Sequence, residues 1–291
     1  MDFVGRHTCL PWIFERDRGS SIPLLAELGG APPYVIVVGD RRRARRILGR
    51  LDEALNLTRH CETKIGAIAA GRVELGVGRT DGVPVMVVES QMGGSATEII
   101  VREVLDRSFH PGGARAVLRV GSCGTLGALD AMPVLAIARF ATGWSAAIEQ
   151  WRRGVLAPPG EHGGGDSDRP PVVACTPAVV EALTAAAATV APGVRVGTGG
   201  IFSKDSLYSE QDDRFAAILE SLGCIATEME LSTIGPLAEW MGVAWGGIMA
   251  SAGRVPDGPW LEPDAIVVNE DLAIGAALAA IRRLAAAGSR S

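Results

Sequence analysis

The chain has 291 residues, of which 47% are hydrophobic and 21% charged, enough for one large domain with a substantial core. A formal net charge of −5 gives no general attraction to nucleic acid or to an anionic membrane, so any anion site must be local. Five scattered cysteines without a CxxC pair, and the lack of an apolar run of membrane-spanning length, predict a cytoplasmic protein with reduced thiols and no structural metal.

The first part of the chain predicts an extension followed by alternating strands and helices. Residues 1–33, rich in proline, are expected to form an irregular N-terminal extension. The apolar run from Tyr34 to Val38 predicts a buried strand that ends at Gly39-Asp40, before a basic helix from Arg41 to Leu51. Further strands are expected at 66–77 and 83–90, followed by a helix that ends near Ser108.

The same alternation continues to the end of the chain. A strand from Ala116 to Val120 ends in a Gly-Ser-Cys-Gly turn, and residues 144–170 are expected to form an inserted surface loop. The remaining predicted strands are 133–141, 194–202, 224–229 and 243–251, and the remaining helices are 177–190, 212–222, a helix ending at Trp240, and 264–287. This pattern predicts a single α/β domain over residues 34–291 with a mostly parallel or mixed sheet.

Three predicted strand ends carry arginine or glycine. The three turns are Gly39–Arg43, Met92–Gly94 and Arg119–Ser122. Because the carboxyl ends of parallel strands meet in one crevice, these turns can share a site, and guanidinium, hydroxyl and backbone N–H groups suit a phosphate oxyanion. Most arginines between 41 and 46 are expected on a solvated helix face, with Arg43 as the exception.

A pair of acids forms the fourth feature of this kind. Successive strand residues point to opposite faces, so Glu228 and Glu230 are expected to point the same way, with Met229 opposed. Two acids at a strand end can hold the vicinal hydroxyls of a sugar. A pair of acids favoured by the dipole of a helix start is the simpler alternative.

Taken in order, five segments of the chain resemble the nucleoside phosphorylases of the purine and uridine phosphorylase type. They are similar to the family's phosphate loop, second glycine turn, central strand, base-flanking segment and ribose motif, and they are Val38–Arg43, Met92–Ser95, Leu118–Gly124, Phe202–Ser209 and Thr227–Glu230. The resemblance implies a three-layer α/β/α sandwich with a central mixed sheet. It also implies a homo-oligomer built from dimers, a hexamer in many members, whose sites borrow residues from a neighbouring subunit.

The resemblance also implies roles for individual residues, with Arg43, Arg119 and Glu230 as the catalytic group. It assigns phosphate to Gly39, Arg43, Arg119 and Ser122, with Arg59, or else Lys64, as the residue given to a neighbour. It assigns the ribose to Met92, Glu228, Met229 and Glu230, with His7 at the 5′ group, and the base to Cys123, Gly124, Phe202, Leu207, Gln211 and Arg254. No cofactor is implied besides inorganic phosphate as co-substrate.

The subfamilies of these phosphorylases differ in the base that they accept and in the residues that bind it. The aspartate that purine-specific members carry after the last core strand falls on Gly253, whereas Gln211 and Arg254 fit the pattern of uridine-cleaving members. The second arginine of the uridine pattern falls instead on Asp213. We therefore expect phosphorolysis of a uridine-like nucleoside, ordinary or 5′-modified, that yields the free base and a pentose 1-phosphate.

Other functions stay open at this point. The alternatives are a purine nucleoside phosphorylase, a nucleosidase that uses water, and a catalytically silent nucleoside-binding homologue. Arg43 and Arg119 argue against the nucleosidase, because hydrolytic relatives generally lack the phosphate arginines. A dinucleotide-binding dehydrogenase is poorly supported, since no GxGxxG follows the first strand.

Overall fold

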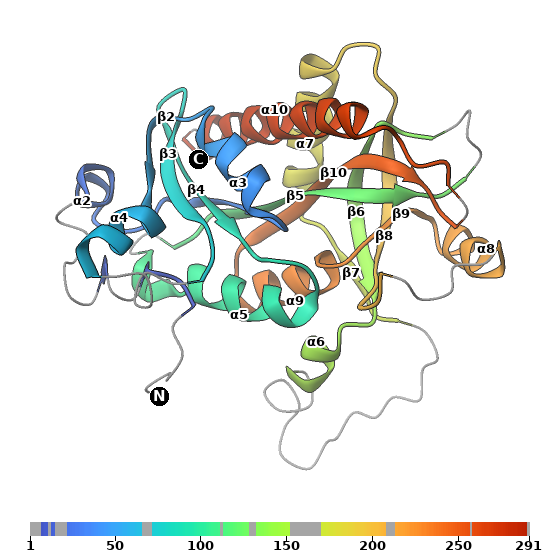
Figure 1. Ribbon diagram of the computed structural model, residues 1–291, viewed down its shortest axis with the longest axis horizontal. Coiled ribbons are helices and arrows are strands. Elements are labelled where there is room, and N and C mark those ends of the chain that lie inside the picture. The colour runs from blue at the N-terminus through green and yellow to red at the C-terminus, as the bar shows by residue number, and fades with distance from the viewer. Residues whose placement is uncertain are drawn as a thin grey trace.

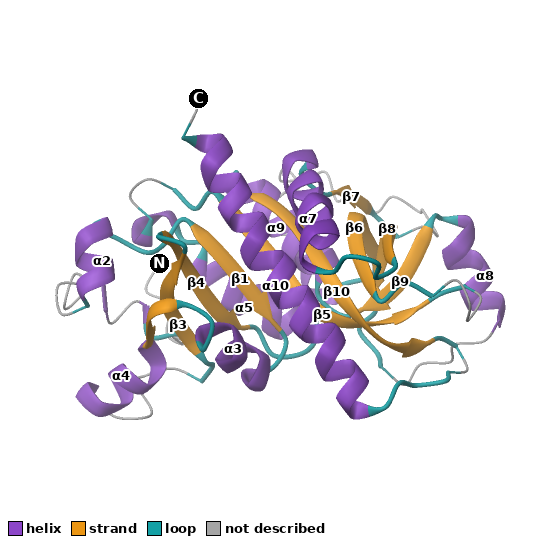
Figure 2. Ribbon diagram, turned by 90° about the horizontal axis from the view of Figure 1, so that it is seen from above, coloured by secondary structure: helices purple, strands orange, loops and turns teal. Residues whose placement is uncertain are grey.

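The computed structural model describes residues 7–10, 13–14, 22–65, 72–110, 113–127, 132–151, 170–207, 213–256 and 258–289. Ten strands within this part of the chain form one mixed sheet, and helices cover both of its faces (Figures 1 and 2). The arrangement confirms the three-layer α/β/α architecture.

The first half of the sheet is organised around β1 (Tyr34–Val38), an apolar strand of which every residue is buried. It pairs in parallel with β4 (Val83–Glu89) on one side and with β5 (Ala116–Thr125) on the other. β3 (Leu75–Thr80) and β2 (Asp52–Asn56) extend the β4 edge by antiparallel pairing. A strand buried on both faces is typical of a sheet with helices above and below.

The second half of the sheet closes on itself. Each of its neighbouring pairs is joined by backbone hydrogen bonds, and the closed order is β5, β10 (Ala244–Arg254), β6 (Leu135–Gly143), β8 (Val196–Ser203), β9 (Cys224–Glu228) and back to β5. A short strand, β7 (Val172–Ala174), pairs with β6 outside this ring. Closure brings the ends of β5, β8, β9 and β10 around one space.

Helices form the two outer layers. One face carries α3 (Arg41–Leu48), α7 (Pro177–Val190) and α10 (Pro263–Gly288), and the other carries α5 (Gly94–Val104) and α9 (Leu231–Met241) (Figure 1). Shorter elements lie toward the edges: α2 (Pro23–Leu28), α4 (Leu57–Ile65), α6 (Ala146–Trp151), α8 (Asp213–Ser221) and a 3-10 turn (Arg107–Phe109). None of the helices traced in the described ranges is long and apolar enough to cross a membrane.

The structure differs from the sequence-based elements at places where hydrophobic periodicity is weak. A strand and a helix, β2 and α4, occupy residues 52–65, where none was predicted, because most of β2 is exposed and polar. The N-terminal extension contains α2, begun by Pro23 and ended by Gly29 in the left-handed region, and α6 starts the expected surface loop. By contrast, the observed bounds of α7 are the predicted ones, since Thr176-Pro177 marks its start.

Leu118 offers a direct test of this core. It is fully buried on β5, between β1 and β10. We expect Leu118→Ala to lower the free energy of unfolding by about 2–5 kcal/mol through lost burial and a cavity. Urea denaturation checks this, with Val268→Ala on exposed helix surface as the control, expected within about 0.5 kcal/mol of wild type. Equal loss in both variants would contradict the assigned core.

Candidate functional site

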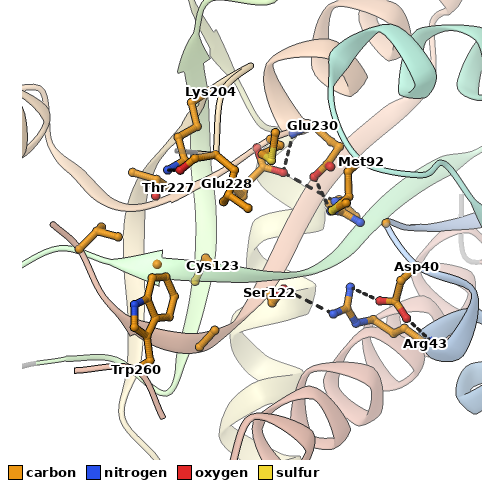
Figure 3. A pocket seen from close by; sticks show the side chains of 17 residues that line it. Asp40, Arg43, Met92, Ser122, Cys123, Lys204, Thr227, Glu228, Glu230 and Trp260 are labelled. Carbon is orange, nitrogen blue, oxygen red and sulfur yellow. Dashed lines mark hydrogen bonds and ion pairs between the residues drawn. The ribbon is translucent and has the colours of Figure 1, made fainter. Parts of the chain in front are cut away.

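A cavity of about 240 Å³ opens where the carboxyl ends of the strands meet (Figure 3). In an open α/β sheet this edge is where ligands bind, because loops from several strands converge there. The cavity is lined by Gly39, Asp40, Arg43, Met92, Arg119, Ser122, Cys123, Gly124, Lys204, Leu207, Thr227, Glu228, Met229, Glu230, Ala252, Val255 and Trp260. Most of the residues predicted from the sequence are therefore brought together in one place.

One end of the cavity is built by the turn after β1 and the start of α3. Asp40 is the N-cap of α3, and its carboxylate accepts a hydrogen bond from the backbone N–H of Arg43 at 2.9 Å. The Arg43 guanidinium lies 3.2 Å from the Asp40 carboxylate and donates to the Ser122 hydroxyl at 3.5 Å. Gly39 leaves room for a second arginine, since a Cβ there would lie 3.2 Å from Nη2 of Arg119. Two guanidinium groups, a hydroxyl and a helix start thus gather at this end.

A buried acid from the last helix holds this end in place. Arg43 and Arg46 both donate to the carboxylate of Glu270 on α10, which is 3% exposed. Arg43 is itself buried, whereas Arg41, Arg42 and Arg45 are exposed. This confirms the prediction that Arg43 does not share the solvated helix face. Sequence reasoning missed Glu270, whose signal is a carboxylate on the otherwise Ala- and Ile-rich inner face of α10.

The centre of the cavity is an arginine between two carboxylates. Nη2 of Arg119 donates to Glu230, and its Nε lies 3.7 Å from Glu228. All three side chains are at most 4% exposed, and burial of such charges is tolerable only with paired, hydrogen-bonded partners. The second oxygen of Glu230 accepts the backbone N–H of Gly93 at 3.0 Å. Gly93 has a φ of 89°, a conformation that glycine adopts without strain.

The two acids reach Arg119 from different elements. β9 ends at Glu228, and Glu230 begins α9 as its N-cap, so the two do not share a strand as predicted, although both carboxylates contact the same guanidinium. Glu228 accepts the backbone N–H groups of Glu230 at 2.8 Å and Leu231 at 2.9 Å, and it also accepts the Ser203 hydroxyl. It therefore satisfies free N–H groups at the start of α9.

These surroundings separate the two acids electrostatically. Burial, reinforced by the neighbouring Glu230 carboxylate, raises the pKa of Glu228 from 4.5 to about 7, against the opposing effect of Arg119. Burial acts on Glu230 in the same direction, but Arg119 and the hydrogen bonds to its carboxylate outweigh it, so the pKa of Glu230 falls below its usual value. Glu230 is thus the permanent carboxylate of the pair near neutral pH.

The other end of the cavity is largely apolar. Figure 3 places Trp260, Thr227 and Lys204 at the end away from Asp40 and Arg43. Trp260 is 61% exposed, and an aromatic ring of this kind can stack on a planar ligand. Cys123 lies along this wall, and burial raises the pKa of its thiol far above the usual range, in keeping with packing and not with a nucleophile. Lys204, Trp260 and Val255 were missed by sequence reasoning.

Among the predicted site residues that the structure describes, four do not line the cavity. Phe202 is buried between Trp144 and Phe215, and the Arg254 Nε donates to the carbonyl of Gly127 at 3.0 Å. The other two are His7, which is hydrogen-bonded to Glu103, and Arg59, which is exposed on α4. The prediction for Gln211 falls outside the described residues. The positions of His7 and Arg59 remain compatible with the prediction that they serve a neighbouring subunit.

The comparison with known proteins agrees with this arrangement. A family model described as "Phosphorylase superfamily" matches residues 33–285, which is most of the chain. The chain belongs to this phosphorylase superfamily, as the nucleoside phosphorylase motifs predict. No curated protein sequence matches it significantly.

Among solved structures, a purine nucleoside phosphorylase from Toxoplasma gondii in complex with immucillin-H is similar, with a TM-score of 0.66 and 21% identity. The match covers 88% of this chain and 92% of that one. At this identity the likeness shows a shared fold, and the fold predicted from the motifs is confirmed by it. The superfamily member described here thus has the nucleoside phosphorylase architecture over nearly its whole length.

The raised pKa of Glu228 predicts a pH-dependent stability. The folded chain holds this proton more tightly than the unfolded chain, so between about pH 4.5 and 7 its stability should fall as the pH rises. Glu228→Gln removes that titration, and the gap in free energy of unfolding between wild type and variant should narrow from pH 5 to pH 8. The lowered pKa of Glu230 affects the stability only at pH values below this range.

Urea denaturation at several pH values measures the effect. Glu239→Gln, an exposed change on α9, is the matched control and should follow the wild-type pH dependence. Parallel pH profiles for wild type and Glu228→Gln would contradict the raised pKa.

Proposed function

We propose that the chain catalyses phosphorolysis of the N-glycosidic bond of a uridine-like nucleoside, ordinary or 5′-modified, and releases the free base and a pentose 1-phosphate. The observation that carries the proposal is the pairing, in one cavity, of an arginine-rich anion end with buried acids suited to a sugar. Phosphate then serves as co-substrate, with no other cofactor.

Buried donors without a hydrogen-bond acceptor support the proposal that this end of the cavity binds an anion. Within the described residues, the Nε atom of Arg43 is buried and has no hydrogen-bond acceptor. The Nε of Arg119 also lacks a hydrogen bond, although it lies 3.7 Å from the Glu228 carboxylate. An unpaired buried N–H group is costly, and an oxyanion held by these arginines would supply the missing acceptors. The Ser122 hydroxyl and the turn at Gly39 add further neutral donors at the same end.

The proposed reaction follows from these positions. The C1′–N bond breaks with its electron pair passing to the base, while the ribose gains oxocarbenium character. A phosphate oxygen held by Arg43, Arg119 and Ser122 stabilises this charge and then forms the new bond to C1′. Glu230, kept ionised by Arg119, accepts hydrogen bonds from the ribose hydroxyls, with Met92 and Met229 against the sugar.

A purine nucleoside is the second candidate for the substrate. It is favoured by the position of Arg254, which donates to Gly127 outside the cavity lining and so is not placed to read uracil. The similar fold of a purine nucleoside phosphorylase is consistent with this alternative. Hydrolysis by water is disfavoured, because both phosphate arginines are present and buried at the site.

We further propose a cytoplasmic homo-oligomer, built from dimers and reaching a hexamer, with no nucleic-acid or membrane partner. Met92 lines the cavity and is 72% exposed, so one wall is open in the single chain. His7 and Arg59 lie outside their own cavity and are the side chains proposed to complete that of a neighbour.

Glu230→Gln tests the sugar end. The variant keeps the shape of the side chain but loses its charge, so kcat/KM for nucleoside cleavage should fall about 100-fold, the effect of two weakened charge-assisted hydrogen bonds. Release of free base from uridine, 5′-modified uridines and inosine, with and without phosphate, is the measurement. Glu239→Gln controls for charge on α9 and should retain activity. An unchanged rate for Glu230→Gln would remove this residue from the ribose site.

Ser122→Ala tests the phosphate end with little risk to folding, since the side chain is only partly buried. Loss of one neutral hydrogen bond should raise the KM for phosphate about 3- to 10-fold, with little effect on the KM for nucleoside. Steady-state kinetics with varied phosphate measures both constants, and Ser108→Ala at an exposed position is the control. A change confined to the nucleoside KM would place Ser122 elsewhere.

A further inference from the structure

Lys204 is an unusual residue for this chain. The sequence contains 26 arginines and two lysines, Lys64 and Lys204, and the second of these lines the cavity. Arginine stays charged in all protein environments, whereas lysine can give up a proton when it is buried. A lysine at this one position of an arginine-rich chain therefore points to a chemical use of the ammonium group.

The backbone fixes Lys204 beside the acids of the sugar site. It directly follows β8, and its N–H donates to the carbonyl of Glu228 at 2.9 Å. The side chain is 8% exposed, and Nζ donates to the carbonyl of Leu207 at 3.1 Å. Figure 3 shows Lys204 next to Thr227 and away from Arg43 and Asp40, which places it at the apolar end of the cavity.

Lys204 brings a positive charge to a part of the cavity that is otherwise mostly uncharged. Apart from Glu228, whose carbonyl accepts the Lys204 N–H, the lining residues around Lys204 are neutral, namely Cys123, Gly124, Leu207, Thr227, Ala252, Val255 and Trp260. An ammonium group carries three N–H donors, and no carboxylate of the described residues forms an ion pair with Lys204. Burial lowers the pKa of Lys204, which makes the ammonium a stronger acid than an exposed one.

We propose that Lys204 donates a hydrogen bond to the carbonyl oxygen of the departing base whose place is taken by an amino group in the amino counterpart. Lys204 thereby makes the site selective for nucleosides of oxo bases over those of amino bases. The inference rests on the proposed function, since it concerns the base released from the same site. It predicts preference for uridine over cytidine and for inosine over adenosine, because an amino group in place of the carbonyl would meet the ammonium donor with a donor of its own.

The ammonium also serves the chemical step. When the C1′–N bond breaks, its electron pair enters the base and is delocalised onto the carbonyl oxygen. Lys204 donates its hydrogen bond there, and its proton passes to the base. The amine regains a proton through solvent, which is balanced by the proton that hydrogen phosphate loses as the pentose 1-phosphate forms. The negative charge that develops on the leaving group thus meets a positive charge already in position.

Paired substrates and one substitution test the inference. For Lys204→Met, kcat/KM on uridine and inosine should fall about 10- to 100-fold, the range for loss of a charge-assisted hydrogen bond. On cytidine and adenosine, kcat/KM should fall much less. The ratio of kcat/KM between the oxo and the amino substrate of each pair should therefore approach one. Lys204→Arg should keep part of the preference, and Arg283→Met, which removes an exposed cation on α10, should match wild type. Equal losses on all four substrates, or none, would overturn the assignment.

A binding measurement separates this inference from the proposed function. Because the chain has two lysines, selective ¹³C labelling of lysine gives two sets of side-chain signals, and Lys204→Arg identifies those of Lys204. Titration with uracil or hypoxanthine should shift the Lys204 signals, and cytosine or adenine should shift them less. If no nucleoside were cleaved with phosphate, the proposed function would fail while this titration would still decide the role of Lys204. Equal shifts with oxo and amino bases would contradict it.

Discussion

The structure depends on one buried cation and the two acids that contact it. Arg119 lies within the central strand β5, where an unpaired guanidinium would be very costly. Glu228 and Glu230 both reach it, and Glu228 in turn accepts backbone N–H groups at the start of α9. The sheet, the helix start and the sugar end of the cavity are therefore parts of one electrostatic unit. The ends of β5 and β9 must keep their register for the charges to remain paired.

A second ion-pair cluster fixes the proposed phosphate end of the cavity. Its acid comes from α10, on the face of the sheet opposite α9. Glu270 on α10 binds Arg43 and Arg46, so the last helix of the chain orients a side chain at the end of the first strand. These partners hold Arg43 in place before any anion arrives, which lowers the entropy lost on binding. In the proposed reaction, both Arg43 and Arg119 are therefore already paired to a carboxylate when phosphate arrives.

The sequence predicted the parts of the fold where apolar runs and caps are strong. β1 and α7 lie at the expected bounds, whereas β2 and α4 went unpredicted because exposed polar residues hide their periodicity. Motifs at strand ends likewise located the centre of the cavity. They could not reveal Glu270 or Trp260, which reach the cavity only through the packing of distant elements. Lys204 lies within the base-flanking motif, but its place in the cavity wall depends on packing that the sequence does not reveal.

The central claim is that the arginine end of the cavity delivers phosphate to the sugar carbon. ³¹P NMR of the purified protein with inorganic phosphate and a nucleoside that it cleaves tests this most directly, because it observes the phosphorus atom itself. The account predicts that the phosphate signal declines as a pentose 1-phosphate signal grows, in equal amount to the base released. Release of base with an unchanged phosphate signal would show that water is the acceptor and would contradict the account.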